Sequence, residues 1–141
     1  MKALLFNARE YGVKFDSFAN RPKEIFHEEI NGKEEQNWSD CVVAFITIEK
    51  DDNKERVSTG ISKAITKMCK EVNRERVAIV PFAHLSNNLG EPSKSFEIFE
   101  EIENKLKSLN LEIIRSHFGS NKSLHLDVYG HAGNARYREF N

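Results

Sequence analysis

Hydrophobic residues recur along the chain at two different spacings, which distinguish helical from extended segments. In residues 57–74 and 92–109, apolar side chains fall three and four positions apart, so each segment would form an amphipathic helix. Pro92 suits the first turn of the second helix, where acidic residues come early and lysines late, as the helix dipole favours. The pattern therefore predicts two helices that lie on an apolar surface.

Seven further segments have the apolar or alternating pattern of β-strands. Residues 41–48 are almost continuously apolar, which predicts a central strand. Residues 122–129 alternate strictly, so the face that carries Leu124 should be buried and the opposite face solvated. The other predicted strands are residues 2–7, 11–18, 23–30, 76–82 and 111–117.

The order of these elements predicts a single α/β (α+β) domain over residues 1–141, with a mixed β-sheet and two helices. A length of 141 residues, of which 39% are hydrophobic and 30% charged, suits one such unit. The polar stretch 31–40 is expected to be a loop, with its Trp38 in a core pocket.

Charge and composition exclude several classes of function. The 21 basic and 22 acidic residues leave a net charge of -1, so any nucleic-acid contact must use a local basic patch. The apolar start of the chain is too short for a secretion signal or a membrane span, and we expect a cytoplasmic protein. Cys41 and Cys69 lie in apolar patterns typical of reduced core thiols. His117, His125 and His131 match no metal-ligand spacing, so no metal or cofactor is expected.

Two polar clusters follow predicted strands and are candidates for chemistry. His84 comes just after the strand at 76–82 and would either line a pocket or cap a backbone carbonyl within a turn. Lys122 follows a turn at Gly119, and its ammonium would either point into a cleft or protect an exposed strand edge. The residues alone leave both alternatives open.

Several of these segments together resemble one known family. The runs VAIVPFAHLSNNLGEPS and HFGSNKSLHLDVYGH, with the KALLF and CVVAFITIEK strands, are similar to the archaeal N-terminal editing domain of threonyl-tRNA synthetase. The resemblance spans essentially the whole chain and implies a D-aminoacyl-tRNA deacylase-like fold, a partial barrel that is usually a homodimer. It also implies hydrolysis of serine mischarged on threonine tRNA, because one methyl group discriminates the two amino acids only weakly.

The resemblance implies partners and site residues as well. The partners would be the aminoacylated 3′ end of threonine tRNA and the remainder of the synthetase. His84 matches the family's pocket histidine and Lys122 its catalytic lysine, and both are expected to take part in catalysis. Phe118 matches a phenylalanine that lines the pocket. Pro81 and Ala83 match positions whose backbone faces the substrate.

Further residues are expected around this pocket. The segment from Val43 to Phe45 would form part of the opposite wall, and Asn121 would contact the substrate beside the catalytic lysine. Arg136 and Arg138 would contact the flexible tRNA end, since the chain as a whole carries almost no net charge.

The chain departs from the family pattern at three places. Asn7-Ala8-Arg9 replaces His-Ser-Asp after the first strand, Asn121 replaces a tyrosine, and Ala135 replaces an acidic residue. The changes at Asn121 and Ala135 favour an alternative, a noncatalytic module that binds the tRNA end or dimerises. The retained His84 and Lys122 favour editing, and removal of D-amino acids from tRNA is a third alternative.

Overall fold

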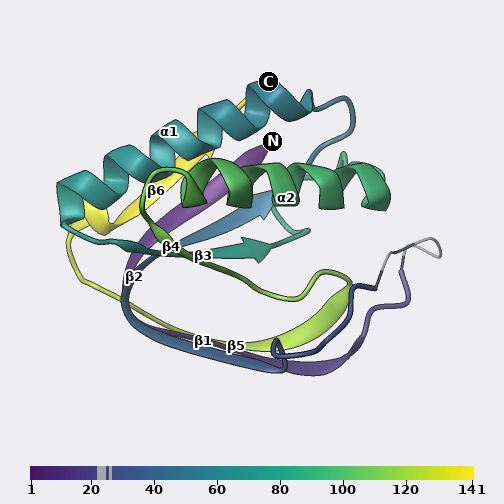
Figure 1. The fold of residues 1–141 in the computed structure, drawn as a ribbon, viewed down its shortest axis with the longest axis horizontal. Helices are drawn as coiled ribbons and strands as arrows, with labels where there is room; N and C mark the ends of the chain where they lie inside the picture. Colours follow the sequence, from purple (N-terminus) through teal and green to yellow (C-terminus); the bar gives the residue numbers. More distant parts are fainter. Residues whose placement is uncertain (22–24, 26) are drawn as a thin grey trace.

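The computed structural model describes residues 1–21, 25 and 27–141, whose strands form one curled mixed sheet with two helices over one face (Figure 1). In chain order the elements are β1 (Lys2–Phe18), β2 (Glu35–Thr47), α1 (Lys54–Val72), β3 (Arg76–Pro81), α2 (Pro92–Lys107), β4 (Glu112–Arg115), β5 (Ser120–Val128), a 3-10 turn (Ala132–Asn134) and β6 (Ala135–Glu139). Within the described ranges, neither helix has the length and apolar character needed to span a membrane.

The sheet is organised around the long strand β1. On one side β1 pairs antiparallel with β2, and on the other it pairs first with β6 and then with β5. Strands β2, β3 and β4 are parallel, and the order across the sheet is β4-β3-β2-β1-β5. The β1–β5 register shifts between Ala8 and Glu10 and between Phe15 and Ser17, and such bulges bend a strand. In Figure 1 the part of β1 that runs beside β5 lies away from the helices.

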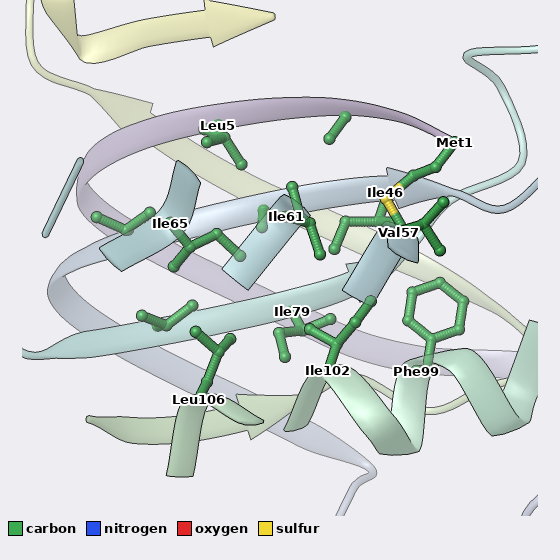
Figure 2. Packing of buried hydrophobic residues seen from close by; sticks show 14 of the residues in the cluster. Met1, Leu5, Ile46, Val57, Ile61, Ile65, Ile79, Phe99, Ile102 and Leu106 are labelled. Atoms are coloured by element: carbon green, nitrogen blue, oxygen red, sulfur yellow. The ribbon is translucent and has the colours of Figure 1, made fainter. Parts of the chain in front are cut away.

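The main core lies between the two helices and the sheet. The apolar stripes of α1 and α2 face strands β1 to β3 in one continuous layer, as Figure 2 shows. Members of this layer are Leu5, Ile46 and Ile79 from the sheet and Ile61, Ile65, Ile102 and Leu106 from the helices. A second apolar cluster, which includes Val43 and Phe45, uses the alternate residues of β2. Strand β2 is therefore covered on both faces, which explains its continuous apolar sequence.

Most of the predicted elements are confirmed. Both helices are present, and the strands predicted at 41–48, 76–82, 111–117 and 122–129 are observed with shifted ends. The strands predicted at 2–7 and 11–18 are one strand, because the chain stays paired through the bulge between them.

Four expectations differ from the structure. Residues 35–40, expected to be a loop, extend β2 because they still pair with β1. The strand predicted at 23–30 falls partly on residues 23, 24 and 26, which lie outside the described residues, and its described remainder contains no strand. Strand β6 was not predicted, since its ARYRE sequence is mostly polar. Leu124 is 49% exposed, because β5 lies on the part of the sheet that the helices do not cover.

The aromatic and thiol predictions are closer to the structure. Trp38 is half-buried and packs beside the second apolar cluster, with the guanidinium of Arg76 at 5.3 Å from its ring. Cys41 and Cys69 are buried and free, as predicted. Burial raises the pKa of both thiols to about 11, so neither is a thiolate at neutral pH.

Candidate functional site

A cavity of about 480 Å³ opens where the parallel strands β2 and β3 end. The ends of parallel strands lie at the same edge of a sheet, a common place for ligand sites. The lining also includes the first turns of α2, the turn that joins β4 to β5 and the first half of β5. Residues of β1 and of the segment after it contribute as well, namely Val13, Ala19, Arg21 and Ile25. Most of the lining surface is apolar, and its polar side chains include Arg21 and Ser95 as well as those of two short segments that carry His84 and Lys122. These two segments form two walls of the cavity.

The first wall is the loop that follows β3. Thr47, at the end of β2, holds this loop because its hydroxyl donates to the carbonyl of Phe82 at 2.6 Å and accepts from the amide of Leu85 at 3.3 Å. Between these anchors His84 is exposed at the cavity, with its ring 4.9 Å from that of Phe82. Within the described part of the chain the His84 ring has no hydrogen-bond partner, which argues against the capped-turn alternative.

The second wall is the turn between β4 and β5 together with the start of β5, from which Phe118, Asn121 and Lys122 line the cavity. The ammonium of Lys122 donates to the carbonyl oxygens of His117 at 2.7 Å and Ser120 at 3.1 Å. It also donates to the Ser120 hydroxyl at 3.0 Å. The lysine therefore folds over its own turn and stabilises it, and each of its three N–H bonds has an acceptor.

Lys122 is electrostatically unusual. Burial lowers its pKa to about 8, an effect that the Glu28 carboxylate partly offsets and the Arg115 guanidinium reinforces. Such a lysine is mostly charged at neutral pH and loses its proton in mildly alkaline solution. Perturbed pKa values of this kind are frequent in functional sites, where charge must be held close to a reacting group.

A buried ionic network lies behind the second wall. The guanidinium of Arg115, whose side chain is 5% exposed, bonds both carboxylate oxygens of Glu28, at 2.7 and 3.1 Å, and also Glu103 of α2. Glu28 accepts from the Phe118 amide at 2.6 Å, and its backbone carbonyl accepts from the His117 ring. Burial alone would raise the pKa of Glu28, but the hydrogen bonds from Arg115 and Phe118 lower it. The network thus joins α2 to the wall.

The structure brings seven candidate residues to one cavity. They are Phe45, Pro81, Ala83, His84, Phe118, Asn121 and Lys122. Val43 is completely buried deeper in β2 and does not line the cavity. Arg136 and Arg138 lie on β6, also outside the lining; Arg136 pairs with Glu71 of α1 at 2.7 Å, and Arg138 bonds a neighbouring backbone carbonyl.

Two positions that depart from the family pattern have structural contacts. The side-chain oxygen of Asn7 accepts from Arg74 at 3.1 Å, and its Nδ2 donates to Asn134 at 3.1 Å, so this nearly buried residue links three segments. Asn121 is exposed at the cavity, where its Nδ2 donates to the Ser17 hydroxyl at 3.1 Å.

Sequence reasoning missed three residues that hold the walls of the cavity: Thr47, Glu28 and Arg115. Thr47 has a local signal, since it is a polar residue at the end of an apolar strand. Glu28 and Arg115 are 87 residues apart, so no local pattern connects them. Across the described ranges, no group of three or more His, Cys, Asp or Glu side chains is arranged to hold a metal ion.

Comparisons with known proteins identify similar chains. Residues 1–140 match the family model of the archaea-specific editing domain of threonyl-tRNA synthetase. The chain is 35% identical over 135 residues to the threonine–tRNA ligase of Thermococcus gammatolerans, a match that covers 93% of this chain and 21% of the ligase. It is 33% identical over 126 residues to the threonine–tRNA ligase editing subunit of Saccharolobus solfataricus, covering 89% and 29%. The chain therefore spans less than a third of either relative.

A solved structure confirms the fold class. The c-Myc DNA Unwinding Element Binding Protein superposes with a TM-score of 0.72, covering 99% of this chain and 98% of that one. At 11% sequence identity the likeness concerns the fold alone. It agrees with the predicted single domain with a mixed sheet and two helices.

The ionic network predicts how one substitution changes the protonation of Lys122. Because the Glu28 carboxylate raises the pKa of Lys122, Glu28→Gln should move that pKa from about 8 to a lower value. A titration that follows the side-chain carbon resonance of Lys122, assigned by its loss in Lys122→Arg, would measure the change. Glu103→Gln is the matched control, because it also removes a carboxylate from Arg115 and should leave Lys122 near 8. A pKa that is unchanged in Glu28→Gln, or equally lowered in the control, would contradict this account.

Proposed function

Because this chain belongs to the archaea-specific editing domain family of threonyl-tRNA synthetase, we propose that its cavity hydrolyses the ester between a wrong amino acid and the 3′ end of threonine tRNA. The observation that carries this proposal is that His84 and Lys122, from segments far apart in the sequence, line the same cavity. We propose serine as the wrong amino acid, since it differs from threonine by one methyl group and is the error that a synthetase site rejects least well.

The reaction requires a water molecule and a site for the negative charge that develops on the carbonyl oxygen. Water attacks the carbonyl carbon, the ester C–O bond breaks, and the ribose oxygen leaves with a proton. The ammonium of Lys122 supplies the positive charge by exchanging one of its two contacts with Ser120 for the oxyanion. The ring of His84, which has no hydrogen-bond partner among the described residues, is available to orient the water or bind the amino group.

The apolar part of the cavity supports a selection by size. Pro81, Ala83 and Phe118 are parts of the lining whose backbone is anchored. Pro81 lies in β3 beside β2, Ala83 lies in the loop that the Thr47 hydroxyl holds, and the Phe118 amide is bonded by Glu28. The extra methyl group of threonine would have to displace either this wall or the attacking water. The proposed cavity therefore acts as a sieve for the smaller amino acid.

Lys122→Ala should lower the hydrolysis of seryl-tRNA by about a hundredfold or more, the usual cost of removing one donor to an oxyanion. The rate of the parent chain, after subtraction of uncatalysed hydrolysis, should fall as the pH rises through about 8, because the lysine then loses its charge. Lys122→Arg keeps the charge and should abolish this fall. Ser123→Ala, a neighbouring exposed change, serves as the control. Parental rates in Lys122→Ala would rule out its catalytic role.

The parent chain should hydrolyse seryl-tRNA about ten to a hundred times faster than threonyl-tRNA, since one methyl group contributes about 1 to 3 kcal/mol. Rates measured on both esters and on D-aminoacyl-tRNA would test this. Asn121→Tyr should raise the rate with serine without changing the ratio, because anchoring and size exclusion are separate contributions. Comparable rates on both esters would refute the sieve, and faster hydrolysis of the D-ester would favour the D-amino-acid alternative.

We also propose that the chain forms a homodimer. Among the described strands β5 pairs only with β1, so its other edge is unpaired, and the exposed Leu124 and Phe18 lie in this region. Unpaired strand edges with apolar neighbours are usually covered. Sedimentation at micromolar concentration should give a mass of about twice the monomer mass of 16.3 kDa. Leu124→Glu should lower the measured mass towards that of the monomer. A parent chain that sediments as a monomer would disprove the dimer.

A further inference from the structure

A second depression, which we term the lysine groove, lies between α1 and α2. Its volume is about 530 Å³, and it is lined by Lys63, Lys67 and Lys70 of α1 and Lys105 of α2. Hydroxyl side chains of α1, together with Ser108 and Leu109 just after α2, complete the lining. The lining contains no Asp or Glu among the described residues. A concave surface lined by ammonium and hydroxyl groups suits an anionic ligand.

Two of these lysines, Lys63 and Lys70, form no ion pair among the described residues. Lys105 bonds Glu55 at 3.0 Å and Glu101 at 3.5 Å, and Lys67 is 3.9 Å from Glu71. In the described part of the chain Lys63 and Lys70 form no ion pair, and both are exposed. Their charges are therefore available to a ligand.

Ser62 provides an independent observation. Its side chain lies at the lining of the groove, the residue is 5% exposed, and its hydroxyl has no hydrogen-bond partner among the described residues. By contrast, the hydroxyl of Thr66, one turn later, donates to the backbone carbonyl of Ser62 at 2.7 Å. A buried hydroxyl without a partner is uncommon in folded proteins, and such a group beside unpaired lysines indicates a missing acceptor.

The spacing of the lysines identifies the class of ligand. Lys63, Lys67 and Lys70 lie about 6 and 4.5 Å apart along the axis of α1, given the helical rise of 1.5 Å per residue. A row of positive charges over two turns matches a ligand with repeated negative charges, as in a nucleic-acid backbone. Because the net charge of the chain is only -1, such a row would provide local attraction that the molecule as a whole lacks.

Helix α2 connects the lysine groove to the catalytic cavity. Ser95 and Phe99, in its first half, line the cavity, whereas Lys105 lines the groove together with Ser108, which directly follows the helix. The distance from Ser95 to Ser108 is about 20 Å along the helix axis. We propose that the lysine groove binds phosphate groups of the same tRNA whose 3′ end enters the cavity. This inference rests on the proposed function for the choice of RNA.

The test compares Lys63→Glu/Lys70→Glu with Lys14→Glu/Lys54→Glu, which changes the net charge equally at exposed lysines outside both the groove and the cavity. Binding of uncharged threonine tRNA is measured between 50 and 200 mM salt. The groove variant should bind about tenfold or more weakly at 0.1 M salt, and its salt dependence should fall by about 1.5 in logarithmic slope, as expected for two lost phosphate contacts. The control variant should bind within about twofold of the parent.

Two further measurements separate this proposal from its alternatives. Lys63→Gln/Lys70→Gln removes the charges without adding carboxylates, and it should still lower the tRNA affinity, although less than the glutamate variant does. A loss of affinity in the glutamine variant would exclude repulsion by the new carboxylates as the whole effect. Hydrolysis of the serine ester of adenosine, which has no phosphate, should be unchanged in the groove variant. If the parent chain does not hydrolyse the ester but the groove variant still binds tRNA more weakly than the parent, only the proposed editing function would be overturned.

Three results would overturn the inference. Unchanged tRNA affinity in the groove variant, or an equal loss in the control variant, would show that the groove has no specific contact with tRNA. Normal tRNA affinity with lost association to the remainder of the synthetase would make the groove a protein surface instead.

Discussion

The curvature of β1 is the constraint on which the site depends. Thr47 pairs with Lys2 at the start of this strand, and Lys122 pairs with Phe15 near its end. In a flat strand these positions would be about 43 Å apart, yet Thr47 and Lys122 line one cavity. Two bulges in the pairing with β5 allow the bend, and the sheet closes far enough to bring its distant parts together. The cavity is thus a result of strand geometry as much as of its lining.

The second wall obtains its order from buried charge. Burial of an arginine is costly unless its donors are satisfied, and the two carboxylates around Arg115 provide this in a directional way. An apolar pair of similar size would fill the space but would not bond the Phe118 amide or the Ser116 carbonyl of this wall. The same groups lie close enough to influence the protonation of that lysine. The same ionic network therefore holds the second wall in position and influences the charge of Lys122.

The parts of the fold that follow from local patterns were accessible from the sequence. The helices and β2 could be predicted because the spacing of their apolar residues follows the faces that they bury. The join of two segments into β1 and the polar extension of β2 could not, because backbone pairing across the hairpin determines them. Exposure of Leu124 was equally inaccessible, since alternation shows which side chains share a face and not whether anything covers it.

The candidate site divides in a similar way. Seven residues expected from the motifs line one cavity, because each lies at a strand end or in a turn close to its motif. Val43 was placed too close to the opening, since alternation gives the face of a residue and not its depth. The link between Glu28 and Arg115 depends on a contact between distant segments, and each residue on its own looks like an ordinary surface charge.

The burial of both cysteines has a practical consequence for studies in solution. Cys41 and Cys69 are held as protonated thiols within the core, and thiol reagents react with accessible thiolates. A cysteine introduced at an exposed site would consequently be the one fast-reacting thiol, without removal of the natural pair. Dyes or spin labels can then be attached at chosen points on the surface, and the native packing around α1 and β2 remains intact.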